Sequence, residues 1–496
     1  ASCNQLVYLY DAIVHRFSGE ITPFLELMGK PRPFQETPGE TPAGTEPTPS
    51  LRIASLDIGG GTTDLMITTY HAEANRALVP TQNFREGFRI AGDDVVKAII
   101  EEVVVAALRQ ALETAGRNDA GELLKQLFGG DQAQMSEQER HRRRQFAIRV
   151  LQPTALAVMR AYESAHATAD REPGYLRIGD VVAPEDDEGE AQALYGYVDA
   201  AVPAADFRVA DVEVPVVPDR IDAVIGRVMR ELLHHVGEAV WSLDCDLLLL
   251  AGRPSRLPAV RDILREQLAV TPDRVVAMDD YRIGTWYPFR SRDNVHISDP
   301  KTTAAVGCML CALADPERPD GSRIGNFTLM TRRLQMRSTA RFIGEMARNG
   351  QIWDDKLLFA DLDLDAASQG GQSADIQMFA PMRIGFRQLP YERWTATPLY
   401  LLDFTPGGGR RSKPFTVTVE RADVDDVDEE TSPDPQRQAR NEALRRQAEA
   451  MREAFAPTEV VDAQGDPCRL GDVELRLHTL GFDDSYWLDT GVLELR

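Results

Sequence analysis

The sequence predicts an α/β fold followed by a β-rich domain, and three observations support this prediction. Two apolar runs flank three successive glycines within residues 51–69, as expected for two strands joined by a tight turn. Segments with strand and helix patterns then follow one another, with one long interruption, to about residue 317. After about Asp320, short segments that alternate between apolar and polar residues predominate, and this period of two is typical of strands.

Length, charge and cysteine usage narrow the class of protein. The 496 residues suffice for two to four domains, and a hydrophobic fraction of 43% supports a sizeable core. A net charge of −23 repels nucleic acid and anionic lipid, so we expect neither as a partner. No apolar run has the length of a membrane span, and no signal-peptide pattern opens the chain. Five cysteines in so long a chain do not form a disulfide framework, which favours a reducing compartment.

The first fifty residues divide into two parts. Residues 1–30 carry apolar positions at helical spacing and predict a helix, either one that crosses between two lobes or an ordinary surface helix. Residues 31–50 contain six prolines together with glycine, threonine and glutamate. This composition cannot bury a core, so we expect a flexible, partly extended linker.

The glycine turn at 59–61 is the strongest candidate for a functional site. Successive N–H groups in such a turn form a concavity that suits an anion, typically phosphate. Asp57 and Asp64 flank the turn, and two carboxylates beside a phosphate suit a nucleotide that is bound with Mg²⁺. The structural alternative is a glycine hairpin with two solvated aspartates.

The elements after the hairpin predict one lobe, residues 51–117 and 241–317, with an α-rich subdomain of residues 118–240 inserted in it. The predicted elements of the lobe are strands at 51–58, 64–69, 77–84, 247–250 and 275–278, and helices at 92–115, from about 257, and from 300. The apolar run 247–250 is typical of a strand covered on both faces. Within the insertion we expect helices at 147–164 and 221–241 and a strand near 195–201.

Residues 324–496 predict the β-rich C-terminal domain, to which the sequence assigns no chemistry. The predicted strands are 356–364, 382–386, 399–404, 415–419 and the end of the chain, 473–496. The charged segment 432–456 predicts an exposed helix.

Several other motifs favour structural roles. The spacing of Cys308 and Cys311 is that of a redox or zinc site, but no partner pair accompanies them, and their alanine-rich segment predicts a closely packed helix. Residues 140–144 (RHRRR) predict a solvated helix face. His234 and His235 point to different helix faces, which argues against a shared metal ion. Gly407–Gly409 predict a hairpin. Asp361, Asp363 and Asp365 fit strand alternation better than a calcium loop.

Three stretches resemble the actin, heat-shock-70 and sugar-kinase superfamily of ATPases. DIGGGTTDL (57–65) resembles its second phosphate motif, RIAGDD (89–94) resembles a G-G-x-D segment that opens a helix, and LLLLAGRPSRLP (247–258) resembles its adenosine motif. The order of the predicted elements is that of the ribonuclease-H-like lobe found in this superfamily.

This resemblance implies ATP or ADP and Mg²⁺ as ligands. It assigns Gly59, Gly60, Gly61, Thr62 and Thr63 to the phosphates, Asp57 and Asp64 to the metal and the attacking water, and Ala251, Gly252, Arg253 and Arg256 to adenosine. The sequence departs from the motif, because Ala251 replaces its usual first glycine, and Arg253 and Pro254 lengthen the turn. The base preference therefore stays open.

Three further stretches resemble the bacterial virulence-factor SrfB family: WYPFRSRDNVHISDPKTTAAVG (286–307), IGFRQLPYERWTATPLYLL (384–402) and YWLDTG (486–491). Together the resemblances imply slow ATP hydrolysis coupled to lobe movement and partner binding. One alternative is an inactive scaffold with the same fold, and another is a small-molecule kinase. A bacterial cytoplasmic protein is expected, or one exported without a conventional signal peptide.

The superfamily uses two lobes, each with a phosphate-binding turn, and no second turn of this kind precedes Asp57. The chain starts at Ala1, within a predicted helix. We therefore expect the C-terminal part of a longer protein. The first lobe would come from the N-terminal part of the same protein or from a separate chain, docking on 5–28 and 300–314.

Overall fold

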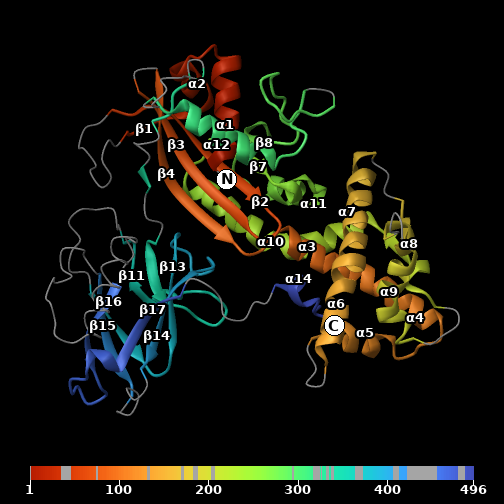
Figure 1. The fold of residues 1–496 in the computed structure, drawn as a ribbon. Helices are drawn as coiled ribbons and strands as arrows, with labels where there is room; N and C mark the ends of the chain where they lie inside the picture. Colours follow the sequence, from red (N-terminus) through yellow and green to blue (C-terminus); the bar gives the residue numbers. More distant parts are fainter. Residues whose placement is uncertain are drawn as a thin grey trace.

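The structure, a computed structural model, is a mixed α/β protein built around one central sheet (Figure 1). It describes residues 2–495 except 35–45, 74–75, 131–134, 169–171, 183–187, 203–206, 293–294, 317–323, 325–326, 331–334, 337–339, 363–372, 406–412, 422–454 and 479–485. Among the helices of the described residues, none is long and apolar enough to cross a membrane.

The central sheet has the strand order β8-β7-β2-β3-β4-β9, with β1 added beside β2. Its strands are β1 (Lys30–Arg32), β2 (Thr48–Ile58), β3 (Thr63–Glu73), β4 (Ala77–Phe88), β7 (Leu247–Ala251), β8 (Val275–Ala277) and β9 (Gln335–Met336). β2 and β3 form an antiparallel hairpin, while β7 runs parallel to β2 on its other side. The predicted hairpin and the predicted parallel strand at 247–250 are therefore confirmed.

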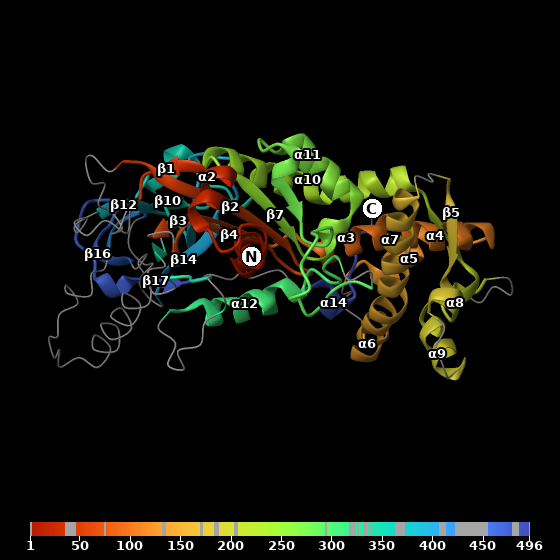
Figure 2. The ribbon, with the colours of Figure 1, turned by 90° about the horizontal axis from the view of Figure 1, so that it is seen from above.

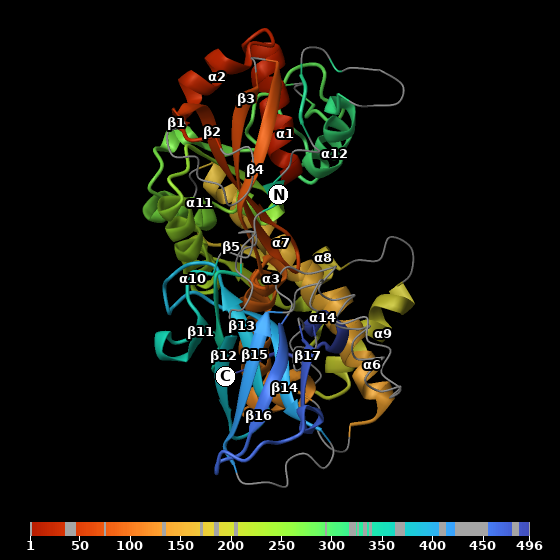
Figure 3. The same ribbon diagram turned by 90° about the vertical axis from the view of Figure 1, so that its left-hand side faces the viewer.

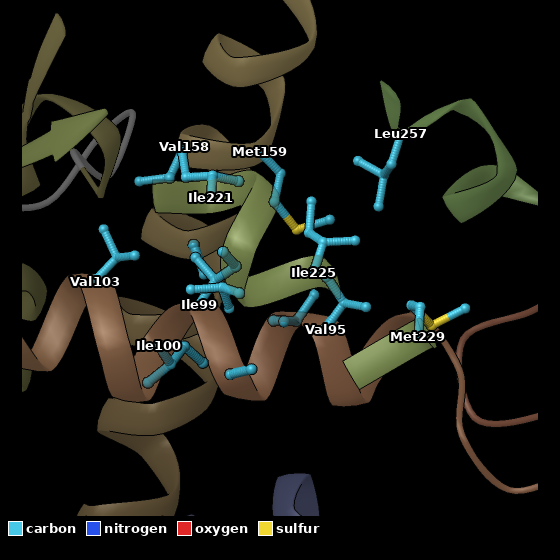
Figure 4. Packing of buried hydrophobic residues seen from close by; sticks show 14 of the residues in the cluster. Val95, Ile99, Ile100, Val103, Val158, Met159, Ile221, Ile225, Met229 and Leu257 are labelled. Carbon is cyan, nitrogen blue, oxygen red and sulfur yellow. The ribbon is translucent and has the colours of Figure 1, made fainter. Parts of the chain in front are cut away.

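Helices cover both faces of this sheet, because successive side chains of its inner strands point to opposite faces. Leu248 and Leu250 enter one core, whereas Leu247, Leu249 and Ala251 enter the other. The first face carries α3 (Gly92–Ile99), a π-helical turn (Ile100–Val104), α4 (Val105–Thr114), α7 (Gln152–Ala167), α10 (Pro218–Ser242) and α11 (Pro258–Gln267). Figure 4 shows α3, α7 and α10 packing through aliphatic side chains such as Ile99, Met159 and Ile225.

The opposite face carries α1 (Ser2–Tyr10), a π-helical turn (Asp11–Arg16), α2 (Ile21–Met28) and α12 (Thr302–Ala314), as Figure 2 shows for α12. The single helix predicted for residues 1–30 is wrong, because Ser18 and Gly19 take positive φ and end the first helical stretch. The surface-helix alternative is also wrong, since Val7 and Leu9 are completely buried.

The predicted linker 31–50 has ordered ends. Arg32 in β1 forms a bidentate ion pair with the buried Asp246, with nitrogen–oxygen distances of 2.6 and 3.0 Å. Residues 48–50 pair with β1 as the beginning of β2. The stretch 35–45 lies outside the described residues.

The segment between α4 and α10 is mostly helical and shares its core with the first face of the sheet. It comprises α5 (Ala120–Phe128), α6 (Glu137–Phe146), a π-helical turn (Ala147–Leu151), β5 (Gly174–Arg177), α8 (Ile178–Val181), α9 (Glu188–Asp199) and β6 (Glu213–Val216). The strand predicted near 195–201 is wrong. Tyr195 and Val198 are both buried in α9, and this spacing of three residues outweighs their preference for strands.

Residues 340–478 form the β-rich region, whose strands lie together at one end of the molecule (Figure 3). One sheet has the order β11 (Leu357–Phe359), β10 (Phe342–Glu345), β13 (Met382–Arg387), β14 (Thr397–Phe404) and β17 (Val473–Leu477). A second sheet has the order β12 (Ser373–Met378), β15 (Phe415–Arg421) and β16 (Phe455–Val461). The strands predicted at 382–386, 399–404 and 415–419 are thus confirmed.

Three predictions in this region need correction or lie beyond the description. Among the described residues of the predicted terminal strand 473–496, 473–477 form a strand, whereas 487–490 form the helix α14 (Trp487–Thr490). Of the predicted helix 432–456, residues 455 and 456 belong to β16, and the rest lies outside the described residues, as do Gly407–Gly409, Asp363 and Asp365. Asp361 follows β11 with a φ of 54°, so a turn and not strand alternation explains it.

The loop between β13 and β14 joins the β-rich region to the central sheet. Trp394 is completely buried there, with its ring 5.9 Å from Phe84 and 5.0 Å from His235 between centroids. Thr397 donates a 3.0 Å hydrogen bond to Glu86, and burial raises the pKa of that glutamate. A tryptophan anchor and a half-buried carboxylate therefore hold the two parts together.

The C-terminal segment 486–495 returns to the helical segment. Arg143 in α6 is 1% exposed and donates a 2.9 Å hydrogen bond to the carbonyl of Thr490. The backbone N–H of Leu493 donates to the carbonyl of Phe128 at 2.8 Å. The prediction that 140–144 is a solvated face is therefore wrong for Arg143, whose partner lies 347 residues away in the sequence.

We predict that Trp394→Ala lowers the free energy of unfolding by about 3–5 kcal/mol, because it empties a completely buried site. Trp353→Ala is the control, since this side chain in the same β-rich region is 41% exposed and should cost less than about 1 kcal/mol. Urea unfolding measures both values, and equal losses would contradict the anchoring role of Trp394.

We also predict that His71 makes the protein sensitive to acid. Its side chain is 5% exposed, and burial, together with the charges of Arg32 and Arg52, lowers its pKa from 6.5 to about 4. The unfolded chain takes up a proton below pH 6.5 and the folded protein does not, so stability falls as the pH drops from 6.5 towards 4. Melting temperature against pH should be flatter in His71→Leu than in the wild type, whereas the exposed His141→Leu should leave the profile unchanged.

Candidate functional site

The tip of the β2–β3 hairpin is a four-residue turn, Gly59–Thr62, closed by a 2.9 Å hydrogen bond from the Gly59 N–H to the Thr62 carbonyl. Gly60, Gly61 and Thr62 are exposed. Their N–H groups donate to none of the residues that the structure describes. These donors form the kind of concavity that binds an anion.

The start of α3 and the turn after β7 pack directly against the back of this hairpin. The N–H groups of Gly92 and Asp93 donate to the carbonyls of Gly59 and Gly60 at 3.0 and 2.8 Å. Gly252 takes a φ of +81°, and a Cβ there would lie 2.0 Å from the Ile58 carbonyl oxygen. Three backbone turns therefore meet at the ends of β2 and β7.

Asp57 and Asp64 face each other across the hairpin as directly paired residues. The Oδ2 of Asp57 accepts a 3.3 Å hydrogen bond from the Nδ2 of Asn4, whose Oδ1 accepts one from the Thr303 hydroxyl at 2.6 Å. Partial burial raises the pKa of Asp64, and the charge of Asp57 raises it further. This pair of mutually repelling carboxylates fits Mg²⁺, which needs few protein ligands because it keeps waters and binds phosphates.

Two of the predicted phosphate residues differ in exposure. Thr62 is exposed, whereas Thr63 is completely buried, and its hydroxyl donates a 2.7 Å hydrogen bond to the Ile90 carbonyl. The Thr63 side chain therefore fixes the hairpin against the loop that precedes α3.

Two of the predicted adenosine residues lie beside Asp57, because Ala251 of β7 is in register with it and a Cβ at Gly252 would lie 2.9 Å from its Oδ1. Ala251 and Gly252 are buried. The two arginines of the turn are paired with acidic residues, Arg253 with Glu163 at 3.8 Å and Arg256 with Asp279 at 3.5 Å. Their charges are thus partly compensated within the protein.

The C-terminal segment reaches this site. The hydroxyl of Tyr486 donates to the carboxylate of Asp93, and the Nε1 of Trp487 donates to the Asp93 carbonyl at 3.2 Å. Burial, and then the charge of Asp94, raises the pKa of Asp93. The same carboxylate would lie 3.2 Å from a Cβ at Gly60, so Tyr486 touches the element that supports the hairpin.

Sequence reasoning missed Asn4 and Tyr486 as neighbours of the site. Asn4 lies 53 residues from Asp57, and Tyr486 lies 393 residues from Asp93. No local pattern links residues so far apart. The YWLDTG motif was the one signal that the C-terminal segment matters, and it gave no location.

We predict that Gly252→Ala lowers the free energy of unfolding by more than about 2 kcal/mol, because φ is positive and the new Cβ would clash with Ile58. Gly61→Ala is the matched control. A Cβ at Gly61 has no neighbour within 4 Å, so a loss below about 0.5 kcal/mol is expected. Similar losses in chemical unfolding would show that the turn after β7 does not depend on contact with the hairpin.

A family model described as Virulence factor SrfB matches residues 1–494, and the chain therefore belongs to the SrfB family. The predicted SrfB resemblance is thereby confirmed, and the match includes the hairpin, the β-rich region and nearly all of the C-terminal segment. No curated protein matches the sequence.

Proposed function

We propose that this SrfB-family protein binds ATP or ADP with Mg²⁺ at the β2–β3 hairpin, in a ribonuclease-H-like lobe of the actin and heat-shock-70 type. The proposed activity is slow ATP hydrolysis, coupled to a conformational change and to binding of a protein partner. The observation that carries the proposal is the meeting of three backbone turns at the ends of the parallel strands β2 and β7. Ligands of α/β sheets bind at this edge.

The topology supports the same proposal. In the order β4-β3-β2-β7-β8, β3 runs opposite to the other four strands, and a helical segment separates the hairpin from β7. This arrangement agrees with the element order expected for such a lobe. Agreement along a whole sheet is stronger support than any single motif, because glycine turns alone occur in many folds.

Each part of the site has a proposed role. The N–H groups of Gly60, Gly61 and Thr62 bind phosphate oxygens, and Asp57 and Asp64 orient metal-bound waters and the attacking water. Mg²⁺ supplies neutralisation of the phosphate charge when it is bound. Phosphoryl transfer depends on positioning and charge more than on a nucleophile, so hydrogen-bonded Asp57 is suited to an orienting role.

Ala251 and Gly252 place the adenosine beside the carboxylates, with Arg253 and Arg256 at its edge. Both arginines are already paired with acidic residues. Binding that uses them has to exchange these ion pairs for contacts with the ligand, which weakens the net gain.

We further propose that a second lobe completes the pocket, either from the N-terminal part of the same protein or from another chain. The described residues contain one glycine turn flanked by aspartates, and a single turn leaves the phosphates open to water. Electrostatic contacts are weaker there than in a closed pocket.

The alternative proposal is a scaffold of the same fold without hydrolysis. The specific observation in its favour is that Tyr486 and Trp487 hold Asp93, while the arginines near the adenosine position are paired. In this alternative the site is an assembly point, and the C-terminal segment is one of its permanent parts.

Calorimetry of residues 1–496 with ATP tests these proposals. We expect Mg²⁺-dependent binding with a dissociation constant on the order of 1 mM. The double variant Asp57→Ala with Asp64→Ala should lose this binding and any phosphate release while keeping its melting temperature, because both residues lie at the polar end of a strand turn.

Asp273→Ala, whose side chain is 77% exposed and lies away from the hairpin, is the control and should bind as the wild type does. Tight binding by the wild type would show that one chain completes the pocket and would refute the second lobe. Absence of binding at saturating ATP would agree both with the scaffold alternative and with a pocket that needs the second lobe, and ATP binding measured with the second lobe present separates these two cases.

A further inference from the structure

One cysteine of α1 and two of α12 meet between these helices, which are about 300 residues apart in the sequence. Cys3 of α1 and Cys308 and Cys311 of α12 line one wall of a largely apolar cavity of about 620 Å³, which also borders β3 and β4. The two helices lie side by side (Figure 3). The Sγ atoms of Cys3 and Cys308 are 3.2 Å apart, and both residues are free thiols.

The packing of the two helices keeps these thiols together. A Cβ at Gly307 would lie 2.0 Å from the Cys3 carbonyl oxygen, so the backbones are in direct contact beside the pair. The residue after Cys3, Asn4, accepts a 2.6 Å hydrogen bond from the buried Thr303 hydroxyl, which lies one turn before Gly307 in α12. The short distance between the two sulfur atoms therefore follows from the close backbone contact of α1 and α12.

The other cysteines are less suited than this pair to react with an oxidant. Cys245 is buried, and burial raises the pKa of its thiol to about 12, so it has little reactive thiolate. Burial also raises the pKa of Cys311. Cys468 lies in the β-rich region, where its Sγ is 3.7 Å from the Asp466 carbonyl. Cys308, in contrast, is exposed and accessible to an oxidant.

We propose that Cys3 and Cys308 form a reversible disulfide when the protein meets a peroxide. The thiolate of Cys308 attacks the peroxide oxygen, giving a sulfenic acid and releasing water or an alcohol. The Cys3 thiol then attacks the sulfenic sulfur, which forms the S–S bond and releases a second water. The two thiols lose two electrons and two protons, and the peroxide is reduced; a dithiol reverses the step.

A disulfide of this kind fits a reducing compartment, where such bonds are transient and act in redox sensing. It would join residues that are 305 positions apart. Because a cross-link across so long a loop restricts the unfolded chain strongly, the oxidised protein should melt at a higher temperature than the reduced one.

The test uses the full chain treated with a small excess of hydrogen peroxide. Thiol titration under denaturing conditions should fall by two of the five thiols, and peptide mapping by mass spectrometry should find Cys3 linked to Cys308. Dithiothreitol should restore both thiols and the lower melting temperature.

Cys3→Ser and Cys308→Ser should each abolish the cross-link. Cys311→Ser, one turn further along α12, is the matched control and should keep it. The proposal is overturned by a Cys308–Cys311 link, by a disulfide between two chains on a non-reducing gel, or by oxidation of Cys308 to a sulfinic acid with Cys3 still free. Mapping of the wild type decides among these outcomes even if a serine variant does not fold.

Discussion

Direct backbone contact between the hairpin tip and two neighbouring turns is the constraint on which the centre of this structure depends. The N–H groups at the start of α3 donate to the carbonyls of Gly59 and Gly60, and Gly252 lies against Ile58 with no room for a side chain. Helix N-termini leave N–H groups without partners inside the helix. Here the hairpin carbonyls accept hydrogen bonds from two of them. These bonds, and the Gly252 contact with Ile58, fix the positions of α3 and β7 relative to β2.

The three stretches whose sequence resembles the SrfB family fasten other elements to this centre. Trp286, from the first stretch, donates a 2.8 Å hydrogen bond to the buried Asp11 of the first helical segment. The second stretch contains Trp394, which attaches the β-rich region, and the third contains Tyr486 and Trp487, which attach the C-terminal segment to α3. Aromatic residues of these three stretches thus act at the contacts between parts of the molecule.

The sequence predicted those elements whose burial follows a simple period. The strands at 51–58 and 247–250 are buried on both faces and were visible as apolar runs, and the glycine turn between aspartates located the hairpin.

Errors arose where contacts with residues far away in the sequence determine the local structure or burial. α9 contains residues with strand preference, Arg143 is buried beside the distant C-terminal segment, and helix α14 has few residues, of which Trp487 packs into the core. For the candidate site, the sequence supplied the residues of the turns but not Asn4, because its contact with Asp57 depends on the path of α1.

That path places α1 between the hairpin site and the Cys3–Cys308 thiol pair. Asn4 touches Asp57 on one side and Thr303 of α12 on the other, and its neighbour Cys3 touches Cys308. The contacts form one continuous series from the exposed surface of α12 to the hairpin carboxylates. Since side chains in such a series are close-packed, we expect a shift of α1 against α12 to disturb the hydrogen bond between Asn4 and Asp57. A device that fixes or releases the α1–α12 contact is therefore expected to act on the geometry of the hairpin site.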